Sequence, residues 1–94
     1  MKGLRFEWDE AKSRSNLRKH GLSFEEAVSV FADDFAQLIA DPDHSEAEER
    51  FILLGMSGKL RILVVCHSFD PGARLVRVIS CRKANRREMI NYRR

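Results

Sequence analysis

The chain has 94 residues, the length of one domain, and its 44% hydrophobic and 33% charged residues are typical of a charged globular protein. No apolar run approaches the roughly 20 residues that span a bilayer, and charges occupy the N-terminal segment where a signal peptide has its apolar core. The two cysteines, Cys66 and Cys81, lie in apolar runs and are too few for a disulfide framework. We therefore exclude collagen-like, disordered, membrane and disulfide-stapled classes, and expect residues 1–94 to form a single cytoplasmic domain with reduced thiols.

The charges are unevenly distributed along the chain. Residues 1–20 hold six Lys and Arg against three acids, residues 21–49 hold nine acids and no Lys or Arg, and residues 50–94 hold eleven Lys and Arg against two acids. Such a chain can present a basic face to phosphates and an acidic face to a basic partner. Alternatively, the acidic middle pairs with the basic ends across the fold.

The first third of the chain predicts a short strand and two helices. Phe6–Trp8 alternates apolar and polar residues, as in a strand. Asp9 is a suitable N-cap for a helix over 10–20, which ends in cations followed by Gly21. Ser23 and Glu26 have the spacing of a capping box, and apolar residues at helical spacing extend the second helix from residue 24 to about 31.

The rest of the chain predicts strands and a final helix. Residues 36–40 form a short apolar strand, and the acidic segment 41–49 is a loop. Apolar runs at 50–56, 60–69 and 75–81 follow, separated by short glycine-containing turns that are typical of hairpins. Connections this short require antiparallel pairing.

Asn85, with a glutamate three residues later, begins a last helix that ends near Tyr92. The order is strand, helix, helix, four strands, helix. We expect an α+β domain with a small antiparallel sheet, helices packed against it, and part of the other face open.

The first helix carries a polar face. Lys12, Asn16, Lys19 and His20 follow one another at i, i+4, i+7 and i+8. Amines bind phosphates, and an imidazole transfers protons near neutral pH. The alternative is a solvated face on which His20 only complements the helix dipole.

The strand over 60–69 has two distinct faces. Leu60, Ile62, Val64 and Cys66 make one face continuously apolar, which predicts that it faces the core. Arg61 and His67 then mark the two ends of the opposite face. In the next strand neither alternating set is uncharged, so no core face is predicted there, and an arginine at its end such as Arg82 is ordinarily exposed.

The last helix is basic, and no metal or cofactor site is predicted. Its arginines are Arg86, Arg87, Arg93 and Arg94, and Tyr92 is either a packing residue or a phenol beside a phosphate. The histidines and cysteines lack ligand spacing, and there is neither a Gly-rich phosphate loop nor a serine nucleophile motif.

These motifs resemble the BrnT toxin family over nearly the whole chain. The residues that carry the resemblance are Phe6-Glu7-Trp8-Asp9, Lys12, Asn16, the run Lys19-His20-Gly21-Leu22-Ser23-Phe24-Glu25-Glu26-Ala27, His44-Ser45, Glu49-Arg50, Leu54-Gly55, Ile79-Ser80, Arg82, Ala84, Glu88 and Tyr92. Cys81 departs from the pattern, since the family more often has alanine at this position, and we expect only packing to change.

The resemblance implies a bacterial type II toxin with a RelE-like fold that arrests growth by cutting RNA. It also implies a BrnA-like antitoxin with a ribbon-helix-helix DNA-binding part, in a complex that represses its own operon. Operator DNA would then be contacted only through the antitoxin.

Metal-independent RNA cleavage needs a base for the attacking 2′-hydroxyl, cations for the developing phosphorane charge, and an acid for the leaving 5′-oxygen. We assign charge stabilisation to Arg61 and Arg82, since guanidinium groups bind phosphate in a bidentate manner. The candidates for proton transfer are His20, His67 and Tyr92, and those for substrate binding are Lys12, Asn16, Lys19, Ser80 and Arg86. This assignment requires Arg61, Arg82 and the first helix to converge on one hollow. The rival functions are a nucleic-acid-binding module that does not cleave and a pure protein-interaction module.

Overall fold

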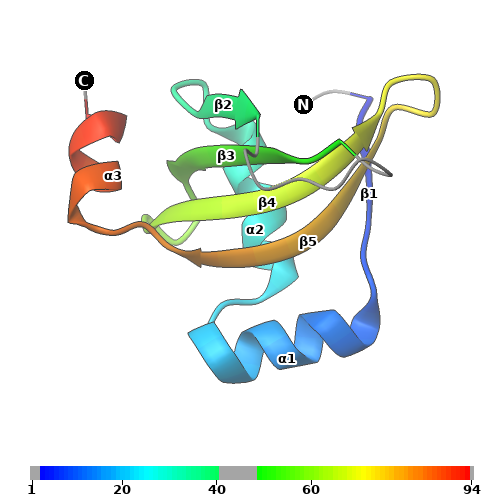
Figure 1. Ribbon diagram of the computed structural model, residues 1–94, viewed down its shortest axis with the longest axis horizontal. Coiled ribbons are helices and arrows are strands. Elements are labelled where there is room, and N and C mark those ends of the chain that lie inside the picture. Colours follow the sequence, from blue (N-terminus) through cyan, green and yellow to red (C-terminus); the bar gives the residue numbers. More distant parts are fainter. Residues whose placement is uncertain (1–2, 41–48, 94) are drawn as a thin grey trace.

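The computed structural model describes residues 3–40 and 49–93, which form an α+β fold with one five-stranded sheet and three α-helices (Figure 1). The elements are β1 (Arg5–Glu7), α1 (Glu10–His20), α2 (Phe24–Ser29), the 3₁₀ turn η1 (Val30–Ala32), β2 (Gln37–Ala40), β3 (Phe51–Met56), β4 (Ile62–Asp70), β5 (Leu75–Lys83) and α3 (Arg86–Tyr92). The predicted fold class and element order are confirmed, with bounds that agree to within two residues. The loop predicted over 41–49 lies, except for its last residue, outside the described residues.

The helix ends follow from local hydrogen bonds. The Asp9 carboxylate accepts from the Lys12 N–H at 3.1 Å, and Gly21 ends α1 in the left-handed conformation at φ 70°. Asn85 forms the complete capping box predicted for α3. The capping box predicted for α2 is half formed. The Ser23 hydroxyl accepts from the Glu26 N–H, but the Glu26 carboxylate does not reach back to the backbone of Ser23.

The sheet has the order β1-β5-β4-β3-β2. The four strands from β2 to β5 pair antiparallel, as the short turns predict, whereas β1 pairs parallel to β5 through residues 5–7 and 75–77. The sheet is therefore mixed, not wholly antiparallel. Most of the chain separates β1 from β5, so no hairpin turn constrains the direction of that pair.

The hydrophobic core lies between the sheet and the layer formed by α2 and η1 (Figure 1). Its buried side chains are Leu22, Phe24, Ala27, Val30, Leu53, Leu63, Val65, Val78 and Cys81. The facing predicted for β4 is wrong: Leu63 and Val65 point into this core, and the alternate residues point to the open face. Because β4 is a central strand whose two faces are both apolar, hydrophobicity alone does not select the face that the helices cover.

A β-bulge changes the alternation of β5. Cys66 pairs with Ser80 and the next residue, His67, pairs with Val78, so Ile79 has no direct partner. The extra residue reverses which alternate side chains of β5 face the core. This is why neither alternating set in that strand is uncharged.

The open face of the sheet is lined by side chains from four strands. Directly paired residues share a face, and they form two rows across the sheet: Gln37–Leu54–Val64–Arg82 and Ile39–Ile52–Cys66–Ser80. In Figure 1, α1 runs along the β5 edge, and α3 lies at one end of β3. These two helices border the open face.

Candidate nucleic-acid interface

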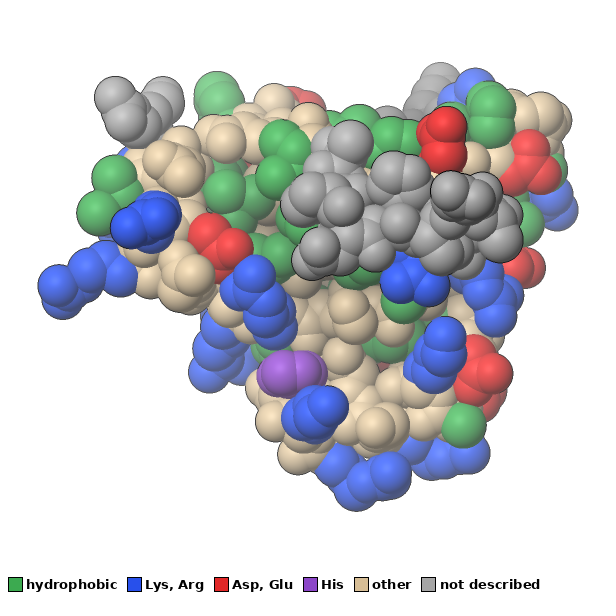
Figure 2. All heavy atoms as spheres, in the orientation of Figure 1, with side chains coloured by type: hydrophobic (Ala, Val, Ile, Leu, Met, Phe, Trp, Pro, Cys, Tyr) green, Lys and Arg blue, Asp and Glu red, His purple; other side chains and the backbone are tan. Residues whose placement is uncertain are grey.

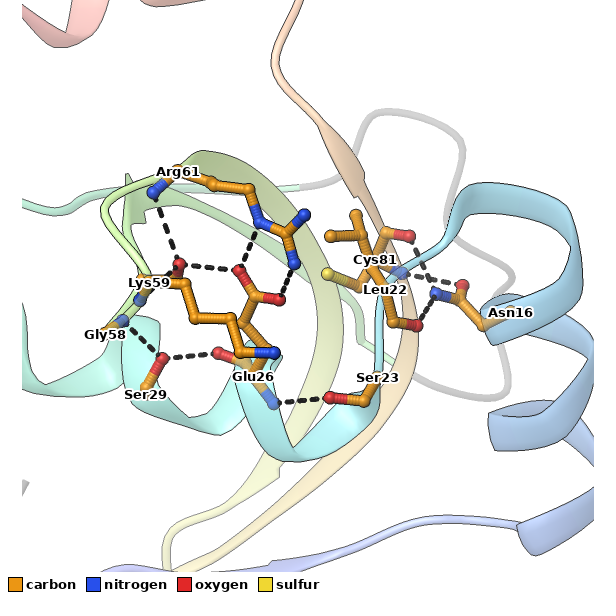
Figure 3. A network of polar contacts seen from close by, with 10 residues as sticks. Asn16, Leu22, Ser23, Glu26, Ser29, Gly58, Lys59, Arg61 and Cys81 are labelled. Atoms are coloured by element: carbon orange, nitrogen blue, oxygen red, sulfur yellow. Dashed lines mark hydrogen bonds and ion pairs between the residues drawn. The ribbon is translucent and has the colours of Figure 1, made fainter.

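Asn16 attaches α1 to the edge of β5. Its amide nitrogen donates to the backbone oxygens of Cys81 at 2.9 Å and Leu22 at 3.0 Å, and its amide oxygen accepts from the Cys81 N–H at 3.0 Å (Figure 3). β1 covers only the first part of β5, so the Asn16 amide pairs with the Cys81 backbone much as a neighbouring strand would. Asn16, which we expect to bind substrate, lines the concavity along α1, and its buried amide also holds the end of α1 in place.

Between α1 and the open face lies a cavity of about 260 Å³, which we call the central hollow. It is lined by His20, Ile52, Val64, Cys66, Ser80, Cys81 and Arg82. His20 comes from the last turn of α1, and the other residues come from three adjacent strands. Burial raises the pKa of the Cys81 thiol to about 12, so the thiol stays uncharged and packs as a small apolar group.

A second concavity of about 180 Å³ continues from the central hollow along α1. The two share His20 and Ser80, and further polar groups along the second come from Lys12, Ser15, Asn16 and Lys19. The structure thus brings the polar face of α1, expected from its spacing, against the end of β5 that carries Ser80.

Arg82 is held at the rim by Glu88. Its NH1 and NH2 atoms donate to the two carboxylate oxygens of Glu88 at 2.8 and 2.9 Å, and NH1 also contacts the Lys83 carbonyl at 3.3 Å. The Arg82 guanidinium lowers the pKa of Glu88, and Glu88 raises the pKa of Arg82. The pair stays ionised, and the guanidinium, with 45% of its side chain exposed, keeps further N–H groups for a ligand.

Positive charge gathers around this face. Figure 2 looks onto the open face, and Lys and Arg side chains lie along its α1 and α3 sides. The acidic residues of α2, Glu25 and Glu26, belong to an element on the opposite side of the sheet. None of the described acidic residues between 21 and 49 lines the central hollow, and residues 41–48 lie outside the part described.

Arg61 lies on the helix-covered face and does not meet Arg82, so the predicted convergence of the two arginines is wrong. Its guanidinium forms an ion pair with both carboxylate oxygens of Glu26 on α2 (Figure 3). Ser57 donates to the same carboxylate at 2.7 Å, and the Glu26 side chain is only 2% exposed. Hydrogen bonding by Arg61 lowers the pKa of Glu26. This network joins α2 to the β3–β4 turn.

His67 is also on the covered face, where it is 3% exposed. Its ring packs against Phe31 and Phe51, with centroid distances of 4.9 and 6.0 Å. Burial lowers the pKa of His67, which favours the neutral imidazole. The structure therefore places His67 in the interior, away from the central hollow in which we expected it to transfer protons.

Tyr92 and Arg86 lie on α3, outside the central hollow. The Tyr92 hydroxyl donates to Asp33 at 2.6 Å, and Asp33 also accepts from the Met56 N–H at 2.8 Å. Tyr92 thus attaches α3 to the β2–β3 side of the fold, which agrees with the packing alternative. Arg86 lines a separate concavity on α3 together with Met89, Ile90 and Arg93.

The two connected concavities thus bring together six of the ten predicted site residues: Lys12, Asn16, Lys19, His20, Ser80 and Arg82. The Asn16 amide is engaged by the backbone of Leu22 and Cys81, which leaves the other five as possible substrate contacts. Sequence reasoning missed the partnership of Glu88 with Arg82 and the place of Cys66 in the hollow. The sequence shows Glu88 as a helix cap and as one of the residues of the resemblance, but its pairing with Arg82 depends on the turn between β5 and α3.

Two features are absent from residues 3–40 and 49–93, the described part of the chain. No three His, Cys, Asp or Glu side chains in these ranges are grouped so as to hold a metal ion. No helix there is long and apolar enough to cross a membrane.

Comparisons with known proteins bear on the family and the fold of the chain. The family described as the ribonuclease toxin BrnT of type II toxin–antitoxin systems matches residues 8–88. The fold is similar to the crystal structure of the Brucella abortus ribonuclease toxin BrnT, with a TM-score of 0.60 and 28% identity over 88% of this chain and 99% of that chain. A search of curated protein sequences found no match. Because the family match extends over most of the chain, the protein belongs to the BrnT family of ribonuclease toxins of type II toxin–antitoxin systems.

Proposed function

We propose that this toxin is a metal-independent endoribonuclease that cleaves RNA in the central hollow by attack of the 2′-hydroxyl on the adjacent phosphate. The observation that supports this proposal is the meeting of an imidazole, a guanidinium and two amines, from elements far apart in sequence, along one connected concavity. Membership of the family implies an RNA substrate and a protein antitoxin.

His20 is the proposed proton-transfer group. It lies on both the central hollow and its continuation along α1, and it is exposed, so a phosphodiester can reach its ring. Imidazole can take the proton of the 2′-hydroxyl or protonate the leaving 5′-oxygen. Asn16 contributes as a positioning residue, because it holds the α1 turn that carries His20.

Arg82 is the proposed stabiliser of the negative charge that develops on the phosphorane. Glu88 fixes the plane of its guanidinium through two hydrogen bonds, so little rotation remains when the substrate binds. Lys12 and Lys19 are proposed to hold flanking phosphates along α1, and Ser80 contributes a hydroxyl at the junction of the two concavities.

The proposed partner is a BrnA-like antitoxin with a ribbon-helix-helix DNA-binding part. We propose that the complex represses its own operon and that the toxin itself does not contact operator DNA. Induced expression of the toxin alone should stop growth and degrade RNA, and coexpression of the protein encoded by the neighbouring frame should restore both. Growth that continues while the soluble toxin accumulates would contradict the proposal.

The chemistry is tested with purified protein and a defined RNA. Attack by the 2′-hydroxyl predicts products with 2′,3′-cyclic phosphate and 5′-hydroxyl ends, at a rate that a chelator does not change. Arg82→Ala and His20→Gln should each reduce kcat/KM by about a hundredfold or more. Arg77→Ala is the matched control, because Arg77 lies on the same strand, is 41% exposed and is also paired with a glutamate, Glu7.

The two rival functions give different results in the same assay. A binding module would retain RNA in a strongly salt-dependent complex and yield no products. A pure interaction module would neither bind nor cut RNA. Full cleavage by the Arg82→Ala variant would show that the reaction takes place elsewhere on the protein.

A further inference from the structure

A larger cavity adjoins the central hollow on the open face. It has a volume of about 430 Å³ and is lined by Gln37, Ile39, Ile52, Leu54, Val64, Glu88 and Asn91. We call it the α3 hollow, since Glu88 and Asn91 of α3 form one wall. Ile52 and Val64 line both hollows, so the two share part of their floor. The volume lies in the range of about 300–1,000 Å³ that is usual for small-molecule sites.

We propose that the α3 hollow binds the base of a nucleotide next to the cleaved phosphate. The inference rests on the proposed function, because it requires the scissile phosphate to lie in the central hollow. Leu54 and Arg82 belong to one cross-strand row, with Val64 between them. Two strand spacings, about 10 Å, separate them, and one nucleotide spans such a distance.

The lining has the chemistry that a base requires. The aliphatic side chains of Ile39, Ile52 and Leu54 form an apolar floor for the face of a ring. Gln37 donates to the Asn91 backbone oxygen at 2.9 Å, whereas the Asn91 side-chain amide makes no hydrogen bond within the described part of the chain. That amide offers a donor and an acceptor at the wall, the combination that reads the edge of an unpaired base.

The Arg82–Glu88 ion pair connects the two hollows. Arg82 lines the central hollow, and its partner Glu88 lines the α3 hollow. Both Glu88 oxygens already accept hydrogen bonds from Arg82, and one also accepts from the Asn85 N–H at 2.8 Å. Arg82 therefore neutralises the Glu88 carboxylate, and an RNA strand can lie across the ion pair without strong repulsion. An apolar side chain of a protein partner would also pack on the apolar floor. It would make no hydrogen bond to the Asn91 amide, and it would not explain why the α3 hollow adjoins the central hollow.

The experiment combines an abasic scan of the RNA with variants that fill the hollow. Ile39→Trp places a large ring in the hollow from the edge strand β2, where Ile39 is 56% exposed. Leu38→Trp is the matched control, since Leu38 is 59% exposed on the same strand but pairs with Leu53 on the opposite face. Asn91→Ala removes only the amide and serves as a second variant if the tryptophan disturbs the fold.

For the wild-type protein, removing one particular base next to the cleavage site should lower kcat/KM about fivefold or more. Ile39→Trp should cleave intact RNA at this reduced efficiency, and the same abasic position should then have no further effect. Asn91→Ala should change the relative rates with the four bases at that position. Leu38→Trp should match the wild type with intact RNA, with the abasic RNA and in its relative rates with the four bases.

The outcomes separate this inference from the proposed function. If the wild-type protein cuts no RNA, the proposed function fails and the base site fails with it. If it cuts RNA but no abasic position matters, or if Ile39→Trp retains the full abasic penalty, only the base site is refuted. The base site is equally refuted if Ile39→Trp weakens binding of the protein antitoxin and leaves the abasic penalty unchanged.

Discussion

Replacing Asn16 with alanine should strongly destabilise the fold, because three buried hydrogen bonds depend on one amide. These bonds join the amide to the Cys81 N–H, the Cys81 oxygen and the Leu22 oxygen. Each contributes about 1 kcal/mol net, so Asn16→Ala should lower the free energy of unfolding by about 3 kcal/mol. For a chain of this length the total stability is roughly 5–14 kcal/mol, so the loss is a large share.

The assay is urea denaturation followed by far-UV circular dichroism, with thermal denaturation as a second measurement. A loss of about 3 kcal/mol predicts a fall in Tm of roughly 12–24 °C. Asn91→Ala is the matched control: Asn91 is exposed on α3, so its replacement should change stability by no more than about 0.5 kcal/mol. If Asn16→Ala loses less than about 1 kcal/mol with an unchanged denaturant slope, Asn16 does not hold α1 to β5 in the way described.

Two further predictions concern the packing of β3 and the attachment of α3. Gly55→Ala should lower the free energy of unfolding by about 1–3 kcal/mol, because a Cβ there would lie 2.9 Å from the Ala36 Cβ. Gly58→Ala is the control: a Cβ at that position would have its nearest neighbour 3.6 Å away, so stability in the same urea assay should hardly change. Tyr92 is the only tyrosine, and the hydrogen bond to Asp33 raises its pKa to about 12, so its absorbance change should occur near pH 12 while circular dichroism still reports folded protein. The fold stabilises the neutral phenol, so this stabilisation is complete below the ordinary Tyr pKa of about 10 and is lost as the pH rises towards 12. In the Asp33→Asn variant the change should move back towards pH 10, and a wild-type change already at pH 10 would show that the hydrogen bond is absent.

The helix ends were predictable because each depends on residues only a few positions apart. Asp9 and Asn85 cap backbone N–H groups three residues along the chain, and Gly21 adopts a left-handed conformation that costs glycine little. Likewise, the spacing of Lys12 and His20 places them on one face of a helix whatever surrounds it. Such features need no knowledge of the tertiary fold.

The facing predicted for β4 is wrong because it assigns the continuously apolar set of alternate residues to the core, which leaves Arg61 and His67 for the open face. Arg61 faces the helix layer because Glu26 neutralises it, and His67 is buried among aromatic rings as a neutral group. Glu26 is far from Arg61 in the sequence, and the aromatic rings around His67 are likewise distant from it. The apolar alternate residues, Val64 among them, instead form the floor of the hollows on the open face.

The sequence by itself determined the elements, their order, the basic face of α1 and the family, since these depend on local spacing and on residue identity. Only the tertiary structure decided which groups meet. Asn16 sets the edge against which α1 lies, the bulge at Ile79 brings Ser80 to the open face, and the turn after β5 pairs Arg82 with Glu88. Each of these contacts depends on strand register and on packing between distant segments, which one-dimensional patterns do not encode.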